Sequence, residues 1–237
     1  MKKREYKILL IVLVVFFIAI NYSFLDSSLE DFLESEQTSK VLIERVIDGD
    51  TIVSNGTSIR LLGINTPEHG EFFYEEARDF LDDLVTGKNV SLEFVGPRED
   101  KYFRTLAYVF FNGENVNVRM VEEGFGNFYF YDGRDKYSDD LENAWASCLE
   151  KEINLCEKSE DVCSECVGIS GNSIVNSCSF SCDVEDWTIK GEGREKFLFN
   201  GTLEVGESRE FDLDLSDSSG SLFLRDGEGG LVYFGRF

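Results

Sequence analysis

The sequence contains a single histidine, and it has few basic residues for its length. His69 is the only histidine among 237 residues, so a catalytic mechanism that needs a pair of histidines is excluded. Lysine and arginine together number 23, against 46 aspartates and glutamates, which gives a formal net charge of −23. A protein that binds nucleic acid through a broad positive surface is normally basic. Recognition of an anion by this chain would therefore depend on a few local positive groups.

The hydrophobic run near the N-terminus is short. Ile8–Ile20 follows a basic cluster in residues 1–7, an arrangement typical of a secretory signal or a signal anchor. The run falls below the ~20 residues that span a bilayer comfortably, and no small-x-small cleavage motif follows it. We predict an uncleaved signal anchor in residues 1–25 in preference to a removed signal peptide. The rest of the chain would lie on the extracellular face of the cell membrane, with the N-terminus inside, or would be secreted.

Cysteine is absent from the first 147 residues. All six cysteines lie between Cys148 and Cys182, and an even number in an exported chain favours disulfide bonds. The spacing Cys163-x-x-Cys166 followed by Cys178-x-x-x-Cys182 could instead hold a tetrahedral zinc ion. We favour disulfides for these four residues, because the N-terminal segment directs the chain out of the cytoplasm. The sequence does not determine how the cysteines pair.

The hydrophobic pattern divides the rest of the chain into three parts. Residues 26–39 are polar and acidic without a strong period, and they predict a linker. Residues 40–157 alternate between strand and helix signals, and residues 158–237 carry only short strand signals separated by turns. The predicted elements of the middle part are, in order, strands at 41–47, 51–53 and 58–62, a helix at 74–84, strands at 89–95 and 105–111, and helices at 116–123 and 138–151. This order suits a small closed barrel with helices packed outside it, in an α+β protein.

Oxygen atoms suited to a hard cation occur at two separate places in the middle part. Asp50 supplies a carboxylate directly after a tight turn. Asn65 supplies an amide oxygen, and Thr66 supplies a backbone carbonyl held by the rigid Pro67. Calcium prefers oxygen ligands of these kinds. The pattern therefore predicts a Ca²⁺ site formed by Asp50, Asn65 and Thr66.

One carboxylate and two arginines complete the chemistry. Glu68 follows the proline of this segment and is placed to accept a proton from an attacking water. Arg60 and Arg104 lie on predicted strands, or beside them, and two guanidinium groups can fork onto one phosphate. They would neutralise the charge that develops in the transition state. Together with a bound cation, these residues predict cleavage of a phosphodiester bond.

Residues 40–157 resemble the staphylococcal nuclease, or thermonuclease, family. The resemblance rests on Ile47–Thr51, Arg60–Glu68 and Asp100–Tyr108, with weaker support from Asn117–Gly124. The order and spacing of these segments, and the helix between them, agree with the family. The resemblance implies a five-stranded OB-fold β-barrel with three helices that cuts DNA and RNA with calcium.

The resemblance also implies a role for each matching residue. Asp50 and Asn65 would bind calcium with the carbonyl of Thr66, and Glu68 would act as general base or position the water. The residues expected to contact the substrate are Arg60 and Arg104 at the phosphate and, more weakly, Tyr102.

This chain departs from the family at two positions. Asn65 stands where the family usually has aspartate, so the ligand oxygen is kept while one negative charge is lost. We expect weaker calcium binding in an unchanged geometry. Phe103 stands where a glycine is common beside the arginine, and its ring would either crowd the site or offer a stacking face.

Residues 158–237 are predicted to form a small all-β module. Trp187–Lys190 and Leu222–Val232 resemble parts of a lamin-tail domain, an immunoglobulin-like sandwich that is often appended to secreted nucleases. The module is shorter than usual and contains no catalytic set of side chains. Its partner is unknown, and a purely structural role is an equal alternative.

The sequence therefore supports two functions. The first is a calcium-dependent nuclease, extracellular or membrane-tethered, that hydrolyses DNA, RNA or both. The second is a non-catalytic surface binding or adhesion protein built on the barrel and the sandwich. The acidic charge and Asn65 favour the second, whereas Arg60, Glu68 and Arg104 favour the first, which we prefer.

Overall fold

The computed structural model describes residues 6–7, 10–14, 16–17, 38–214 and 220–236. The chain divides between Ser39 and Lys40 into two units, which are described separately. In the first unit, the described residues before residue 18 are helical. No helix within the described residues combines the length and the apolar character that a membrane span requires. The other residues of the predicted anchor, and nearly all of the predicted linker, lie outside the described residues.

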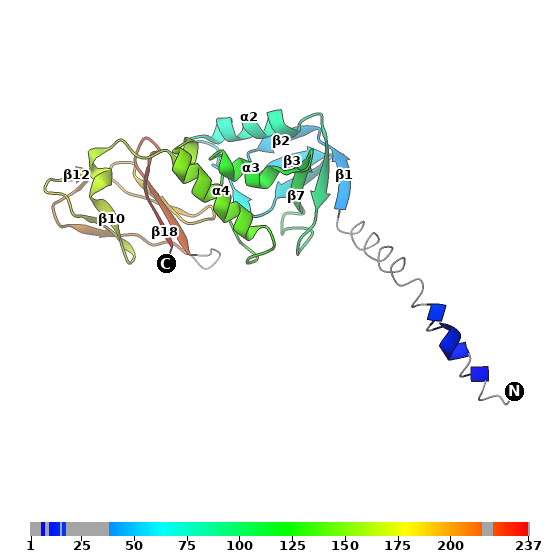
Figure 1. The fold of residues 1–237 in the computed structure, drawn as a ribbon. Helices are drawn as coiled ribbons and strands as arrows, with labels where there is room; N and C mark the ends of the chain where they lie inside the picture. Colours follow the sequence, from blue (N-terminus) through cyan, green and yellow to red (C-terminus); the bar gives the residue numbers. More distant parts are fainter. Residues whose placement is uncertain (1–5, 8–9, 15, 18–37, 215–219, 237) are drawn as a thin grey trace. The chain divides into compact units, whose positions relative to one another are not determined.

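The second unit begins with a closed β-barrel. Its sheet has the order β1-β6-β7-β4-β3-β2, with the two-residue strand β8 Glu114–Asn115 paired to β7 off this path, and β4 and β7 pair in parallel. Because β1 and β2 follow each other in the chain with two residues between them, the sheet closes on itself, and the two count as one bent strand. The predicted five-stranded barrel is therefore confirmed (Figure 1). Its strands are β1 (Thr38–Leu42, of which the part from Lys40 onwards belongs to this unit), β2 Arg45–Asp48, β3 Thr51–Ser54, β4 Thr57–Leu61, β6 Asn89–Glu93 and β7 Thr105–Phe111.

Local turn chemistry explains the β3–β4 hairpin. Asn55 and Gly56 adopt positive φ angles of 48° and 72°, as the two central residues of a type I′ turn must. The twist of such a turn matches that of the flanking strands. Arg60 is consequently placed opposite Thr51 in the register of the hairpin.

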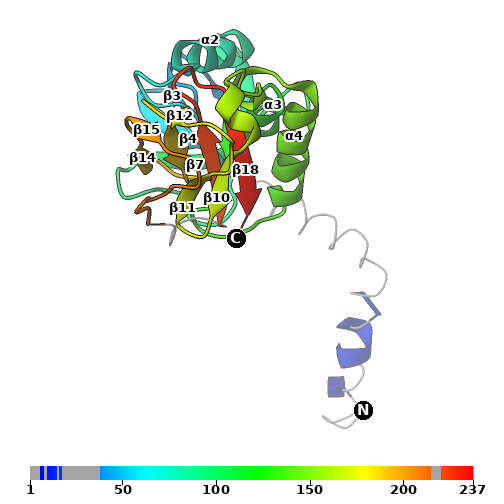
Figure 2. The same cartoon turned by 90° about the vertical axis from the view of Figure 1, so that its left-hand side faces the viewer.

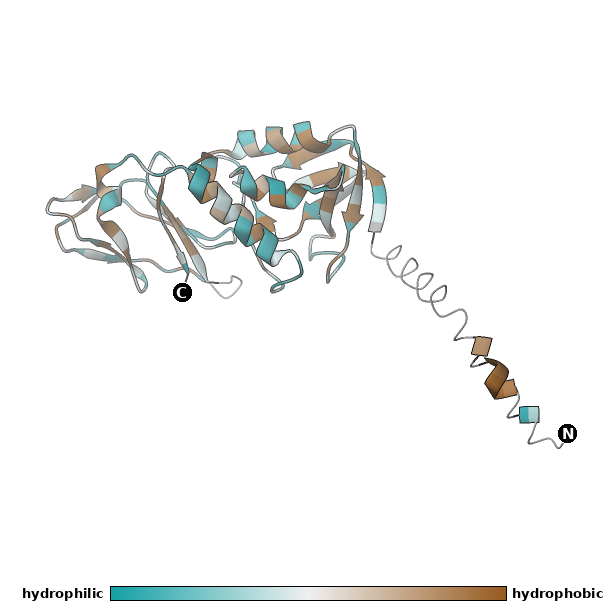
Figure 3. Cartoon of the chain, viewed as in Figure 1, coloured by the Kyte–Doolittle hydropathy of each residue, from teal (hydrophilic) through white to brown (hydrophobic). Residues whose placement is uncertain are grey.

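Three helices surround the barrel, as predicted. They are α2 Tyr74–Val85, α3 Val116–Glu122 and α4 Ser138–Lys151. In Figure 3, α2 and α4 show alternating hydrophobic and hydrophilic bands, as expected for helices with one buried face. Figures 1 and 2 show α3 and α4 side by side. Two further short strands pair with each other, β5 Ile64–Asn65 and β9 Asn127–Phe128.

A buried asparagine fastens α3 to the barrel. Asn117 is fully buried. Its Nδ2 donates to the carbonyl of Leu62 at 2.8 Å, and its Oδ1 accepts from the backbone amide of Val109 at 2.9 Å. Through these two hydrogen bonds Asn117 connects α3 both to β7 and to the segment after β4. That segment carries the candidate site.

The C-terminal region is all-β, as predicted. One sheet has the order β10-β11-β16 and another has the order β14-β13-β17-β18, while β12 pairs with β15. Trp187 and Phe199 lie in a hydrophobic core of its own. The resemblance to a lamin-tail domain stays a prediction. The strands are β10 Val167–Ser170, β11 Ser173–Asn176, β12 Cys182–Asp183, β13 Thr188–Lys190, β14 Lys196–Leu198, β15 Thr202–Leu203, β16 Ser208–Glu210, β17 Ser221–Arg225 and β18 Leu231–Arg236.

All six cysteines are paired in disulfides. Cys148 pairs with Cys156 at the end of α4. In the C-terminal region the pairs are Cys163–Cys182 and Cys166–Cys178, so the four sulfurs weighed for zinc bind each other instead. The structure thus decides between the two alternatives, and it supplies the pairing.

The C-terminal region packs directly against the barrel. The ring of Phe223 in β17 lies 5.2 Å from that of Trp145 in α4, and the ring of Phe234 in β18 lies 5.6 Å from it. Phe223 and Leu231 belong to the barrel's hydrophobic core. These contacts cross the boundary predicted after residue 157, which stays a prediction. They also fix the position of the C-terminal strands relative to the barrel.

Candidate active site

The turn between β2 and β3 and the loop after β5 approach each other closely. Gly49 makes this approach possible, because a Cβ atom at this position would lie only 2.9 Å from the side chain of Thr66. The backbone amide of Thr66 lies 3.4 Å from Oδ2 of Asp50, to which it donates. Two of the predicted calcium ligands, which are sixteen residues apart, are thereby brought together.

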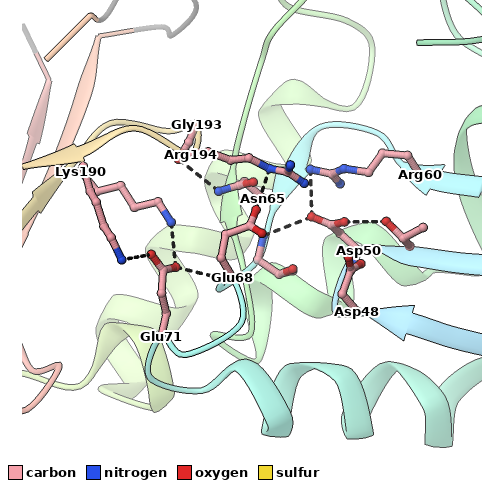
Figure 4. Close-up of polar contacts among 12 residues, drawn as sticks. Asp48, Asp50, Arg60, Asn65, Glu68, Glu71, Lys190, Gly193 and Arg194 are labelled. Carbon is pink, nitrogen blue, oxygen red and sulfur yellow. Dashed lines mark hydrogen bonds and ion pairs between the residues drawn. The ribbon is translucent and has the colours of Figure 1, made fainter. Parts of the chain in front are cut away.

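Arg60 is fixed beside Asp50. Its Nη2 lies 2.9 Å from Oδ2 of Asp50, and both side chains are buried. The guanidinium also donates to the backbone carbonyls of Leu61 and Ile64, both at 2.8 Å. With these partners its orientation is set before any substrate binds (Figure 4).

The charges around Arg60 shift its pKa. Burial lowers the pKa of this guanidinium below its ordinary value, and the Asp50 carboxylate opposes the change. The positive charges of Arg104 and Arg194 lower the pKa further. The charges of two arginines from distant parts of the chain therefore act on Arg60.

The turn between β2 and β3 carries two acidic side chains, Asp48 and Asp50. Burial and the neighbouring carboxylate of Asp50 raise the pKa of Asp48 to about 6. Two acidic side chains in one turn form a place of negative potential, which a bound cation would relieve.

Asn65 presents an unsatisfied oxygen at the same place. The residue is 1% exposed, and its Oδ1 is buried without a hydrogen-bond partner among the described residues. A buried acceptor of this kind is costly unless something binds it. Beside Asp50 and the buried Thr66, it fits an oxygen-liganded cation such as calcium. No group of three Asp, Glu, His or Cys side chains in the described residues is arranged for a metal, so such a site would depend on the amide and on a backbone carbonyl.

Arg104 is held by its own loop. Its Nε donates to Oδ2 of Asp100 at 2.7 Å, and its backbone amide donates to Oδ1 of the same carboxylate at 3.0 Å. Asp100 thus orients Arg104. The ring of Tyr102 lies 5.7 Å from the guanidinium and is largely exposed. Arg104 is thus held by Asp100, its charge lowers the pKa of Arg60, and Tyr102 is open to solvent.

Phe103 adopts a backbone conformation that favours glycine. Its φ angle is 61°, and its side chain is 83% exposed. Bulky residues rarely take this left-handed conformation. The ring does not crowd the site, so of the two sequence alternatives the exposed stacking face is the one that agrees with the structure.

Sequence reasoning missed a set of site residues from the C-terminal region. They lie on the β13–β14 hairpin, defined here as residues 188–198. Arg194 Nε lies 2.6 Å from Oε1 of Glu68 (Figure 4). Lys190 and Lys196 lie 3.0 and 2.8 Å from the carboxylate of Glu71, in the same loop. A charged, glycine-containing turn between two strand signals indicates a hairpin, but nothing local in it indicates where the hairpin docks.

The contact with the β13–β14 hairpin lowers the pKa of the Glu71 carboxylate. Burial alone would raise its pKa, but the ammonium groups of Lys190 and Lys196 and the backbone amide of Glu68 lower the pKa to about 2. Glu71 is therefore an ionised anchor for the hairpin at neutral pH.

The chain is similar to known nucleases. A family model described as Staphylococcal nuclease homologue matches residues 58–158. The thermonuclease of Staphylococcus intermedius is 30% identical over 168 residues, which cover 67% of this chain and 100% of that protein. The thermonuclease of Staphylococcus hyicus is 34% identical over 131 residues, covering 51% of this chain and 76% of that protein. Endonuclease YncB of Bacillus subtilis is 37% identical over 111 residues, covering 42% and 53%. The β13–β14 hairpin lies outside the residues that the family model matches.

Proposed function

The chain belongs to the staphylococcal nuclease family and is a nuclease, and on this premise we propose that it hydrolyses phosphodiester bonds of DNA or RNA with calcium as its cofactor. The observation that carries the calcium proposal is the buried Oδ1 of Asn65, which lacks a hydrogen-bond partner among the described residues. Asn65 is the chain neighbour of Thr66, and in Figure 4 it lies near Asp50. These three residues would hold the ion.

Calcium at this place would polarise the phosphate and stabilise the negative charge of the transition state. Glu68 would accept a proton as water attacks phosphorus, while the bond from phosphorus to the leaving oxygen breaks. Arg60 and Arg104 would bind the remaining phosphate oxygens. Each arginine is already oriented by carboxylate or carbonyl partners, so little reorganisation would be needed when the substrate binds.

We also propose that the enzyme works outside the cytoplasm. The support is the basic cluster and apolar run at residues 1–20 together with three disulfides, which persist in oxidising compartments. Attachment to the membrane by residues 1–25 remains part of this proposal.

The direct test is digestion of single-stranded DNA and of RNA by the full chain, with calcium or with a chelator. We expect cleavage that depends on calcium and that stops when the chelator is added. Cleavage at the same rate with the chelator would contradict the proposed cofactor, and no cleavage up to millimolar calcium would contradict the proposed reaction. The comparison of the two substrates gives the preference for DNA or RNA.

A further inference from the structure

The β13–β14 hairpin is attached to the nuclease site at several points. The carbonyl of Gly193 accepts from Nδ2 of Asn65 at 3.2 Å. The carbonyl of Glu192 accepts from Nδ2 of Asn127 at 3.0 Å. The carboxylate of Glu71, which binds two lysines of the hairpin, adds a third attachment. The tip is thus tied to β5, to β9 and to the loop after β5.

The attachment through Glu192 is the most deeply buried of the three. Glu192 is fully buried, and its Oε2 accepts from the backbone amide of Phe130 at 3.5 Å. At its base, β13 pairs with β17 as well as with β14, and Phe223 of β17 packs on Trp145 of the barrel unit. The hairpin is therefore held both at its tip and at its base. A side chain carried by this tip occupies a defined place in the site.

Arg194 is the tip residue whose side chain extends into the site. In Figure 4 it runs from the hairpin past Asn65 towards Arg60 and contacts Glu68 on the way. Its side chain is 52% exposed and that of Glu68 is 40% exposed, so a ligand approaching from solvent can reach both.

Docking of the hairpin does not explain this placement. An ion pair between two exposed side chains contributes little to stability, and Lys190 and Lys196 already provide charged contacts to the barrel. Arg194 instead adds a positive charge that points towards Arg60 (Figure 4), on which the charge of Arg104 also acts, and like charges in one place repel. In a chain with a net charge of −23, a cluster of three guanidinium groups is matched by an anionic ligand with several oxygens.

We propose that Arg194 is a third phosphate-binding arginine of this nuclease, supplied by the C-terminal region. It would bind a phosphate of the nucleic-acid strand on the side of the site where Glu68 lies. This inference rests on the proposed function. When the strand binds, the guanidinium exchanges the carboxylate of Glu68 for the phosphate. Glu68 is then released to accept the proton of the attacking water.

The test measures binding of a fluorescent single-stranded oligonucleotide by anisotropy, with the full chain, in chelator, over a range of salt concentrations. Each phosphate contact contributes about 0.7 to the slope of log affinity against log salt for single strands. We expect Arg194→Ala to reduce the slope by about that amount and to weaken binding roughly tenfold at low salt. Arg194→Lys keeps the charge but cannot bind a phosphate through two parallel N–H groups. Its affinity for the oligonucleotide should therefore fall between those of the wild type and of Arg194→Ala.

Arg78→Ala is the matched control. Arg78 is an arginine on α2 that pairs with Glu75 and Asp79, so its loss removes one positive charge and one set of exposed ion pairs away from the site. Its salt slope should equal that of the wild type. Glu68→Gln provides the second comparison, because it removes the carboxylate that Arg194→Ala would otherwise leave facing the strand. The effect of Arg194→Ala should persist in that background.

Three results would overturn the proposal. One is an unchanged slope for Arg194→Ala, another is an effect that disappears in the Glu68→Gln background, and the third is tighter binding, which would show that the hairpin blocks the strand. These measurements need no turnover. A wild-type chain that binds the oligonucleotide but digests neither DNA nor RNA with calcium would therefore refute the proposed function separately, and a chain that neither binds it nor digests either substrate would refute both.

Discussion

The side-chain amide of Asn65 donates to the backbone carbonyl of Gly193 at 3.2 Å, although the two residues are 128 positions apart. An aspartate at this position, as is usual in the family, would have no proton to donate at neutral pH and would turn a carboxylate towards the carbonyl. The departure from the family therefore has a structural reason. The Nδ2 of Asn65 holds the hairpin, while Oδ1 remains available for a cation. Asn65 consequently no longer favours the non-catalytic alternative.

Asn65→Asp should have two opposite effects. We expect tighter calcium binding, because the site gains a negative charge and keeps its oxygen. We expect the free energy of unfolding to fall by about 1–3 kcal/mol, because the carbonyl of Gly193 loses its donor. Isothermal calorimetry with calcium and thermal unfolding in chelator measure the two effects. Equal calcium affinity in both proteins would refute the assignment of Asn65 as a ligand.

Glu71→Gln should destabilise the protein at neutral pH but not in acid. The pKa of Glu71 in the folded protein is about 2, against an ordinary value of 4.5. Its ionised form therefore contributes stability above about pH 4.5, and this contribution is lost as the pH falls from there towards 2. We expect a loss on the order of 2 kcal/mol at pH 7.

Thermal unfolding of the wild type and of Glu71→Gln across this range is the measurement. The difference between their melting temperatures should shrink steadily between about pH 4.5 and pH 2. Glu75→Gln, which removes an exposed carboxylate paired with Arg78 on α2, should show no such pattern. A difference for Glu71→Gln that is constant with pH would mean that ionised Glu71 does not hold the hairpin.

Phe103→Gly should stabilise the fold and weaken binding of single strands. The left-handed conformation at φ 61° costs a bulky residue about 1 kcal/mol, which glycine avoids. The exposed ring is available to stack on a base, an interaction worth roughly 1–3 kcal/mol. Phe103→Asn separates the two effects, since asparagine tolerates positive φ and lacks the ring. If both variants bind single-stranded DNA as tightly as the wild type does, the ring has no role in binding.

Much of the nuclease part could be predicted because its signals are local. The Asn55-Gly56 turn requires positive φ at both residues, and the apolar spacing from Tyr74 onwards repeats with the helical period, so β3, β4 and α2 follow from short segments. The residue types of Asp50 and Thr66 indicated a cation site, but the family resemblance was needed to expect them beside Arg60, because the barrel brings these residues together from different elements.

The contribution of the C-terminal region could not be predicted. Arg194 and Glu68 lie on separate layers of the fold, and their contact depends on how β17 and β18 pack against Trp145. Periodicity and turn chemistry describe elements and not their docking. The cysteine pairing was undetermined for the same reason, since spacing alone allows several connectivities.

The most direct test compares turnover of single-stranded DNA, with saturating calcium, by the wild type, Glu68→Gln and Arg104→Ala, with Arg78→Ala as control. Circular dichroism and the melting temperature check that each variant is folded. We expect both site variants to lose several orders of magnitude in kcat, because one loses the proton acceptor and the other a charge that stabilises the transition state. Arg78→Ala should digest DNA at the wild-type rate. Wild-type rates for folded Glu68→Gln and Arg104→Ala would show that the reaction takes place elsewhere on the protein.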